Sequence, residues 1–249
     1  MKTIVVSKIA QVSVRVRSQV ILNQQFTTQM FPFNKSYFPK QKFVFALSGG
    51  IDSIAACKFL KQGNYDFIAA HFNHKFIPQD DETAKNVERF CIKNEIEYSI
   101  LDSNEKYESG SKEDFCRKER YAALGNFVEN NGLEILVTAH HLDDCVESYF
   151  LNFLKGCPEY VPINYSCKYP NFLVVRPFLL NKKVDFGQYV MYHGLEEFVM
   201  EDEMNGDLSL MRNWTRNVVL PMIEQKYKGL DKVVFKKMKK HIDDVVKVM

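Results

Sequence analysis

The sequence has few cysteines and lacks any apolar run long enough to cross a membrane. Its 249 residues include six cysteines, at positions 57, 91, 116, 145, 157 and 167, and no two of them form a C-x-x-C pair. This spacing argues against a cysteine-built zinc or iron–sulfur site and favours a reducing compartment. Charged residues interrupt the longer apolar segments, so we expect neither a transmembrane helix nor a signal peptide and predict a cytoplasmic protein. A chain of this length with 46% hydrophobic residues can bury one large core.

Acidic residues are missing from the start of the chain. Residues 1–51 contain seven Lys or Arg and no acid, residues 226–249 contain eight Lys and three Asp, and residues 52–225 carry a net charge of −10. Basic ends can bind a polyanion such as RNA, around a centre whose carboxylates hold a metal or a cationic substrate. Lysine-rich faces that only contact solvent explain the same pattern, and charge alone favours that simpler explanation.

An alternation of strand and helix patterns begins at residue 43. Strand patterns cover residues 43–47, 67–73, 98–101, 135–139 and 172–175, and helix patterns cover residues 52–62, 78–94, 112–130, 142–155, 183–192 and 212–226. This order predicts an α/β fold with a doubly wound parallel sheet that helices cover on both faces. Gly63, Gly132 and Gly156 mark three of the expected helix ends.

The two ends of the chain have different patterns. Val12, Val14 and Val16 alternate with Ser and Arg, which predicts a strand or hairpin within a basic extension over residues 1–42. An organelle transit peptide is an alternative explanation, although a two-residue period does not suit an amphipathic helix. Apolar residues spaced by three or four predict a lysine-rich amphipathic helix, which we treat as a separate segment over residues 227–249.

The segment SGGIDS, residues 48–53, joins the first strand pattern to a helix pattern. Its glycines let a ligand approach the backbone, and the N–H groups of the first helical turn favour an anion, as does the helix dipole. The two serines can donate hydroxyl groups to phosphate, and Asp52 is placed to hold Mg²⁺ beside them. An ordinary turn whose Asp and Ser only cap the helix is the simpler alternative.

SGGIDS resembles the SGGxDS loop of the N-type ATP pyrophosphatases, the PP-loop superfamily. This resemblance implies a Rossmann-like fold that binds ATP, cleaves it between the α and β phosphates and adenylates a substrate oxygen. Later segments resemble motifs of one branch, the tRNA(Ile)-lysidine synthetases. These segments are AHFNHKF at 70–76, EDFCRKERYAAL at 113–124, TAHHLDDCVESYFLNFLKG at 138–156, VVRPFL at 174–179 and EDEMNGDLSLMRNWTRNVVLP at 201–221.

That resemblance implies a ligase that joins free lysine to the wobble cytidine of an isoleucine tRNA with a CAU anticodon, through an adenylated base. The catalytic domain would cover residues 43–226, ATP and Mg²⁺ would be needed, and a homodimer is one assembly left open. The residues implied are Asp52, Arg117, Asp144, Glu147 and Arg176 for catalysis; Ser48, Gly49, Gly50, Ile51, Asp52, Ser53 and His74 for ATP; Asp143, Asp144 and Glu147 for lysine; Arg120, Arg212, Asn213 and Arg216 for tRNA; and Asp52 for Mg²⁺.

The acidic motif can also be explained without a ligand. Asp143, Asp144 and Glu147 share one face at a helix start, where acids suit the helix dipole. Together with His140 and His141 they could suggest zinc, but the phosphate-type loop favours Mg²⁺.

The basic residues also have simpler explanations. Arg117 and Arg120 are three apart on one predicted helix, as in a phosphate site or in surface ion pairs. His71 and His74 follow a strand, and a lone histidine there is usually structural.

Several positions depart from the motifs that the sequence resembles. Lys75, Phe76 and Ile77 replace Gly-Leu-Arg, Met204 replaces Ser, and Leu210 stands where Tyr is common. We expect the basic ends to supply RNA contacts that many family members obtain from C-terminal domains. Two other functions stay open: a ligase that adenylates another tRNA base or a small acid, and an RNA-binding relative without catalysis. A thiolating enzyme is disfavoured, because a persulfide or iron–sulfur route would need paired cysteines.

Overall fold

The computed structural model describes residues 35–103, 105, 107, 109–157, 161–200 and 206–248. The strand or hairpin predicted near the start of the chain lies outside the described residues, and so do residues 201–205 of the last motif. Within the described ranges, no helix is both long enough and apolar enough to cross a membrane.

Six strands form one sheet in the order β3-β2-β1-β4-β6-β5. Their bounds are β1 Phe43–Ala46, β2 Phe67–Asn73, β3 Tyr98–Asp102, β4 Ile135–Val137, β5 Ser166–Lys168 and β6 Leu173–Val175. β5 pairs antiparallel with β6, and the other pairings are parallel. The central strands consist almost entirely of buried residues, as expected for strands that helices cover on both faces. The predicted α/β class with a parallel sheet is confirmed, and the antiparallel edge strand β5 is an addition to it.

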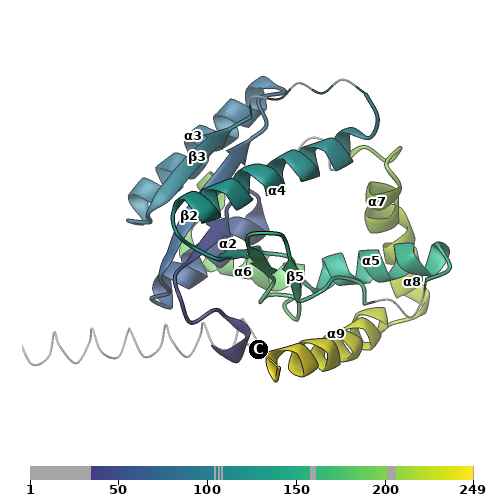
Figure 1. Ribbon diagram of the computed structural model, residues 1–249. Helices are drawn as coiled ribbons and strands as arrows, with labels where there is room; N and C mark the ends of the chain where they lie inside the picture. The colour runs from purple at the N-terminus through teal and green to yellow at the C-terminus, as the bar shows by residue number, and fades with distance from the viewer. Residues whose placement is uncertain are drawn as a thin grey trace, which may run out of the picture. The chain divides into compact units, whose positions relative to one another are not determined.

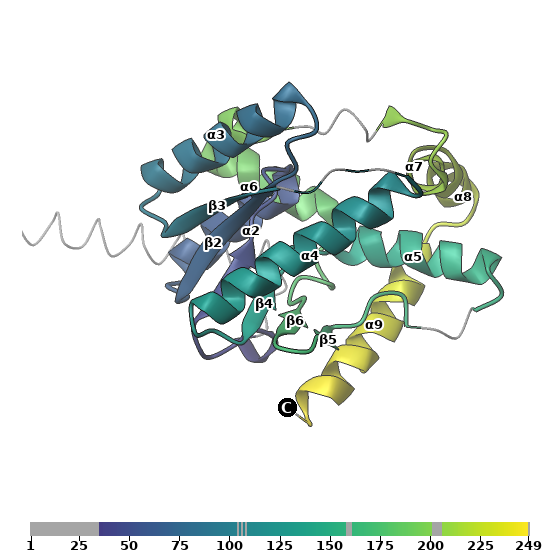
Figure 2. The same ribbon diagram turned by 45° about the horizontal axis from the view of Figure 1, so that its top comes forward.

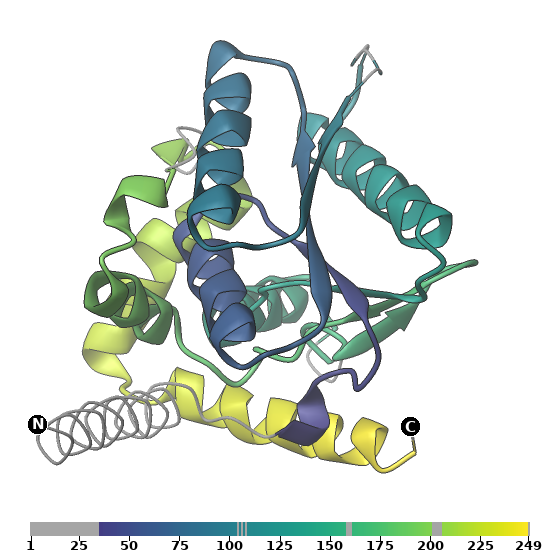
Figure 3. The same ribbon diagram turned by 90° about the vertical axis from the view of Figure 1, so that its left-hand side faces the viewer.

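Helices follow most strands (Figures 1 and 2). Their bounds are α2 Ile51–Gln62, α3 Pro78–Lys93, α4 Lys112–Asn130, α5 Leu142–Leu154, α6 Lys183–His193, α7 Met211–Trp214, α8 Leu220–Lys226 and α9 Leu230–Val246, with 3-10 turns η1 Lys35–Tyr37 and η2 Glu196–Phe198 and a π-helical segment η4 Thr215–Val219. Figure 3 shows α2 and α3 on one side of the sheet and α4, in teal, on the other. α6 packs against α2, and α9 packs against α5 and η1.

The helix predicted over residues 212–226 is interrupted. It consists of α7, the π-helical turn η4 and α8 instead of one regular α-helix. Pro221, in the first turn of α8, has no N–H to donate to the carbonyl of residue 217, and in a regular α-helix its ring would clash with that carbonyl. The wider π turn accommodates the proline, which explains the difference from the prediction.

Gly125 allows α4 to pack closely against the turn that precedes β6. A Cβ atom at this position would lie 2.3 Å from Cε1 of Phe172. We expect Gly125→Ala to lower the free energy of unfolding by about 1 to 3 kcal/mol, because overpacking outweighs the gain of about 1 kcal/mol in helix propensity. Urea unfolding at equilibrium measures this difference.

Gly187 in α6 is the matched control for that substitution. A Cβ atom there would meet only Cδ1 of Ile51, at an ordinary contact distance of 3.8 Å. Gly187→Ala should therefore stabilise the chain by roughly 0.5 to 1 kcal/mol through helix propensity alone. Equal effects of the two substitutions would contradict the packing explanation.

Candidate functional site

The candidate site lies where the order of strands in the sheet reverses, between β1 and β4. One loop leads from the carboxyl end of β1 into α2, and another leads from the carboxyl end of β4 into α5. The N-termini of two helices therefore meet at one edge of the sheet, where parallel α/β proteins bind their ligands.

The loop at residues 48–53 is held by its own hydrogen bonds. Oγ of Ser53 accepts the Gly49 N–H at 3.1 Å, donates to the Gly50 carbonyl at 2.9 Å, and lies 3.0 Å from Oγ of Ser48. Gly49 has a φ of +90°, and a Cβ atom on it would lie 2.8 Å from Cγ2 of Thr83. Both the backbone conformation and the close approach of α3 therefore require glycine here.

The start of α2 remains suited to an anion. Gly50 is the N-cap residue of α2 and provides no side-chain cap, while Asp52 is the acid of the first turn. The backbone N–H of Met200 donates to the Gly49 carbonyl at 3.0 Å, which ties the loop to the chain just before the last motif. The predicted ATP ligands Ser48, Gly49, Gly50, Ile51 and Ser53 thus form one continuous loop and helix start, and their role in ATP binding stays a prediction.

His71 supports the loop from the neighbouring strand. Its Nδ1 lies 2.8 Å from the Leu47 carbonyl, at the end of β1. Burial lowers the pKa of His71, and the hydrogen bond to this carbonyl opposes that effect. The net decrease favours a neutral ring whose Nδ1–H donates to Leu47, which supports the structural explanation for this histidine.

His74 lies among aromatic rings at the end of β2. Its ring is 4.8 Å from the Phe72 ring in an edge-on arrangement and 5.7 Å from the Phe76 ring in a stacked one. Its Nδ1 lies 3.9 Å from Oε2 of Glu119 on α4. The role of His74 in ATP binding stays a prediction.

Lys75 explains one departure from the motif that this segment resembles. Its φ is +59°, a conformation that glycine adopts easily, and the motif has glycine at this position. Nζ of Lys75 lies 3.2 Å from Oδ1 of Asp81 and 3.3 Å from Oδ2 of Asp102. Lys75 therefore adopts the backbone turn that glycine would adopt, and its ammonium group is paired with two carboxylates.

Asp52 and His141 connect the two helix starts. Oδ2 of Asp52 lies 3.4 Å from Nε2 of His141, and Nδ1 of His141 lies 3.6 Å from the nearest oxygens of both Asp143 and Asp144. Burial lowers the pKa of His141, but the hydrogen bond with Asp52 and the charges of the three aspartates raise it above 6.5 overall. His141 is therefore a buried imidazole between the loop carboxylate and the acids of α5, and these carboxylates favour its protonated form.

Asp52 also has a free coordination position. Its Oδ1 is buried and has no hydrogen-bond partner among the described residues. Mg²⁺ usually binds through one or two carboxylates together with phosphate oxygens of a substrate, which a single aspartate beside an anion loop fits. Across the described residues no three His, Cys, Asp or Glu side chains are grouped to hold a metal, so the zinc alternative finds no ligand set there.

Glu147 is bound on two sides by arginines. Its side chain is only 2% exposed, and its Oε2 accepts hydrogen bonds from Nε of Arg212 at 3.1 Å and Nη2 of Arg216 at 3.0 Å. Nε of Arg216 donates to Oε1. Two arginines predicted to contact tRNA thus contact a carboxylate predicted to bind lysine, and both predicted roles stay untested.

The other two acids differ in accessibility. Asp144 accepts the N–H of His141 at 3.0 Å, and its second oxygen lies 3.6 Å from Nη2 of Arg216. Asp143 accepts the N–H of Lys183, the first residue of α6, at 2.7 Å. The Asp143 side chain is 50% exposed and that of Asp144 is 14% exposed, so a cation from solvent meets Asp143 first.

Three predicted arginines surround His140. Burial lowers the pKa of His140 to about 3, and the charges of Arg176, Arg120 and Arg117 add to this effect while Asp144 opposes it. Nδ1 of His140 lies 2.7 Å from Oγ1 of Thr138. The histidine is therefore neutral at physiological pH in a positively charged environment.

The three arginines have different surroundings. Arg176 is buried, and its Nη1 donates to the Asn164 carbonyl at 2.8 Å, while its Nε has no partner among the described residues. Arg117 is exposed on α4, and burial lowers the pKa of Arg120. Asn213 is buried and donates to the Asp207 carbonyl at 3.0 Å, which holds the loop before α7 in place.

The pKa of His140 predicts a pH dependence of stability. In the unfolded chain this histidine binds a proton below about pH 6.5, whereas in the folded chain it stays neutral until about pH 3. The unfolded state therefore gains a proton first, and stability falls as the pH drops between these values. His140→Asn should reduce this loss by up to about 1.4 kcal/mol per pH unit. Urea titrations of both proteins at pH 7, 6 and 5 measure the free energy of unfolding. The same decrease of this free energy with pH in the parent and in His140→Asn would contradict the prediction.

Sequence reasoning missed the role of His141. The sequence pattern suggests His141 only as a zinc ligand beside the aspartates and does not predict its contact with Asp52. The available signal was its position directly before a helix whose first turn has two aspartates, because an N-cap side chain lies beside such acids.

A model of the PP-loop domain family matches residues 20–223. The tRNA(Ile)-lysidine synthase of Actinobacillus pleuropneumoniae serotype 3 (strain JL03) is 34% identical over 211 residues, which cover 80% of this chain and 47% of that protein. The tRNA(Ile)-lysidine synthase of Enterococcus faecalis (strain ATCC 700802 / V583) is 28% identical over 193 residues, which cover 75% and 41%. The chain thus spans about half the length of the curated relatives it matches.

A solved structure shares the fold. The U34-tRNA thiolase NcsA from Methanococcus maripaludis, determined with its 4Fe–4S cluster, has a TM-score of 0.70 and 16% sequence identity, covering 90% of this chain and 79% of that one. The family match extends over most of the chain, and the SGGIDS loop lies at the strand-order reversal of a parallel sheet. The chain therefore belongs to the PP-loop domain family.

Proposed function

We propose that the chain uses ATP to join lysine to a cytidine of an isoleucine tRNA. The observation that carries this proposal is the contact between Asp52 of the loop and His141, which brings an anion-binding helix start beside the acids of α5. Such a site suits two substrates of opposite charge, a nucleoside triphosphate and a cationic amine. The likeness to tRNA(Ile)-lysidine synthases supports the same reaction.

The first proposed step transfers AMP to the base. The O2 oxygen of cytidine attacks the α-phosphorus of ATP, the bond from that phosphorus to the bridging oxygen breaks, and pyrophosphate leaves. The N–H groups of the first turn of α2 bind the departing phosphates, and the hydroxyls of Ser48 and Ser53 exchange their hydrogen bonds within the loop for bonds to phosphate. Asp52 would hold Mg²⁺ through its unpartnered oxygen, and the bound ion would supply positive charge beside the phosphates.

The second proposed step replaces AMP with lysine. The neutral ε-amine attacks C2 of the base, the bond from C2 to the AMP oxygen breaks, and AMP leaves with that oxygen. Asp143 and Asp144 bind the incoming ammonium group, and Asp143, the more exposed of the two, accepts the proton that the amine must lose. Arg117 and Arg176 stabilise the negative charge on departing AMP.

The test is transfer of labelled lysine to RNA. The chain is incubated with ATP, Mg²⁺, radiolabelled lysine and a CAU-anticodon isoleucine tRNA transcript, and the labelled tRNA is counted. We expect label on the tRNA only when ATP is present, with one AMP formed for each lysine attached. AMP formation without lysine transfer would move the assignment to another adenylating ligase, and tRNA binding without AMP formation would overturn an enzymatic role.

A further inference from the structure

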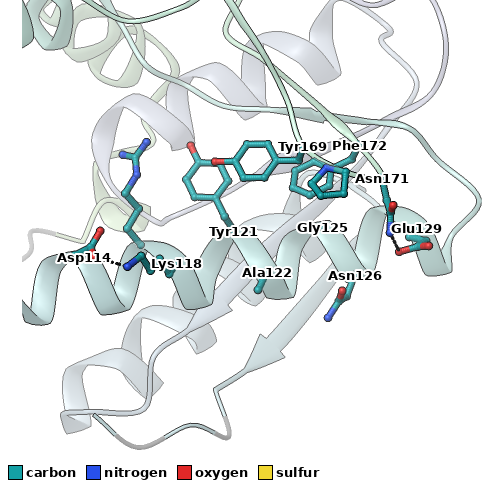
Figure 4. Close-up of a pocket in the computed structure, with 12 residues that line it drawn as sticks. Asp114, Lys118, Tyr121, Ala122, Gly125, Asn126, Glu129, Tyr169, Asn171 and Phe172 are labelled. Atoms are coloured by element: carbon teal, nitrogen blue, oxygen red, sulfur yellow. Dashed lines mark hydrogen bonds and ion pairs between the residues drawn. The ribbon is translucent and has the colours of Figure 1, made fainter. Parts of the chain in front are cut away.

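A groove outside the loop site runs along α4 (Figure 4). Its volume is about 470 Å³, which lies within the roughly 300 to 1,000 Å³ of small-ligand pockets. One wall is the face of α4 that carries Arg117 and Tyr121, and the other is the turn between β5 and β6, with Tyr169 and Phe172. Neither the loop at residues 48–53 nor the acids of α5 line it.

Three aromatic rings form an offset, parallel stack in this groove. The Tyr121 and Tyr169 planes are 4° apart with centroids at 5.5 Å, and the Tyr169 and Phe172 planes are 13° apart with centroids at 4.7 Å. The guanidinium carbon of Arg117 lies 5.2 Å from the centroid of the Tyr121 ring. Parallel rings beside a guanidinium group are the surface on which unpaired nucleobases stack in proteins that bind single-stranded RNA.

Charge is distributed unevenly along the groove. Lys118 is paired with Asp114 at 2.7 Å, and at the far end Glu129 accepts a hydrogen bond from Asn171 at 3.0 Å. Arg117, in contrast, has no carboxylate within ion-pair distance among the described residues, and it is exposed. A phosphate group would therefore bind at the Arg117 end and not at the Glu129 end.

Arg117 also connects the groove to the candidate site. It is close enough to His140 for its charge to affect that residue, and His140 belongs to the loop that leads from β4 into α5. α4 itself follows the carboxyl end of β3, so its N-terminal half begins at the edge of the sheet where the loop site lies. A strand of RNA whose reacting base enters the site can continue into the groove past Arg117.

We propose that the α4 groove binds the nucleotide next to the reacting base, with its base packed against the exposed part of the stack that Tyr121, Tyr169 and Phe172 form and its phosphate at Arg117. The ligand class is single-stranded RNA. This inference rests on the proposed function for the position of the reacting base, and stacking on the rings does not specify which base binds.

The test measures binding of an RNA hairpin whose loop contains CAU, by fluorescence anisotropy without ATP or lysine. Ala122→Trp fills the groove from an exposed position on α4, and Tyr169→Leu removes a flat ring while keeping apolar volume. Each should weaken binding by about 5- to 150-fold, which corresponds to the loss of stacking by one base. Tyr169→Phe should bind like the parent, and so should the control Asn130→Trp, which adds the same ring at an exposed position of α4 outside the groove.

Hairpins that lack one base identify the bound nucleotide. The effect of Tyr169→Leu should disappear for a hairpin without the base next to the cytidine and persist for hairpins without more distant loop bases. Unchanged hairpin binding by both Ala122→Trp and Tyr169→Leu, with circular dichroism like that of the parent, would overturn the proposal. Loss of free AMP binding in these variants, with hairpin binding intact, would also overturn it and assign the groove to a free nucleotide.

The two proposals fail in different ways. Hairpin binding that depends on the groove, without any transfer of lysine, would refute only the lysine reaction. Transfer of lysine by the parent, with hairpin binding unaffected in both groove variants, would refute only the groove.

Discussion

Asp52→Asn should reduce ATP-dependent pyrophosphate release by about 100- to 1,000-fold, the loss expected when one preorganised electrostatic contact to a reacting phosphate is removed. The substitution keeps the size of the side chain but removes the charge that faces the loop. Its Oδ1 has no protein partner among the described residues, so the carboxylate is free to bind Mg²⁺ on the phosphates. The measurement is pyrophosphate release at saturating ATP, with Mg²⁺ titrated for both proteins.

Asp66→Asn is the matched control for this prediction. Asp66 precedes β2, and its side chain is 75% exposed and lies 3.9 Å from Nζ of Lys42. The control should therefore release pyrophosphate at the parental rate with the parental dependence on Mg²⁺. An Asp52→Asn variant with more than about a tenth of the parental rate would rule out the proposed role of Asp52. Asp52 also contacts His141, so the thermal stability of the variant has to be measured beside its activity.

Glu147→Gln should destabilise the fold more than any other single substitution considered for the acidic cluster. Removing one partner of a buried ion pair costs about 3 to 5 kcal/mol, because the remaining charge stays desolvated. Arg212 and Arg216 keep about a third of their side chains exposed, at 33% and 30%, so water screens part of this cost. We expect a loss of about 3 kcal/mol, which lowers the melting temperature by roughly 6 to 12 °C for a chain of this size.

Calorimetric melting of the parent and of Glu147→Gln measures this loss. Glu129→Gln is the control, because Glu129 lies on the surface of α4 and accepts one exposed hydrogen bond from Asn171. The control should melt within about 1 °C of the parent, as surface substitutions usually do. Adding Arg212→Gln and Arg216→Gln to the Glu147 variant should recover part of the stability. A Glu147→Gln protein as stable as the parent would show that the two arginines do not depend on this carboxylate.

The elements of the fold were predictable where their patterns were long. The strand at residues 67–73 and the helix at residues 112–130 have the predicted bounds. The strand is one continuous buried run, and the helix is bounded by Ser111 as its N-cap residue and by Gly132 just after its end. β5 was not predicted, because Ser166, Cys167 and Lys168 form only three antiparallel pairs and have no distinctive pattern. The π turn at residues 215–219 also escaped prediction, although Pro221 provided a physical reason for it.

The candidate site was predictable in position but not in its contacts. Parallel strands followed by a glycine loop and by an acidic helix start must meet at one edge of the sheet, which the residue pattern shows. The pairing of Glu147 with Arg212 and Arg216 joins residues 65 and 69 positions apart, and no local pattern reports it. The contact between Asp52 and His141 also joins residues that are far apart in the sequence, so no local pattern predicts it.

Lys75 separates two properties that sequence comparison usually treats as one, the identity of a residue and the path of its backbone. An alignment with the lysidine synthetase motif scores the position as a lost glycine, whereas the chain still turns through a φ of +59° into α3. The lysine reaches Asp81 and Asp102 from this conformation. Among related chains, a non-glycine residue at this turn should covary with acids at those two positions, because the two carboxylates pair with the lysine that this backbone conformation presents.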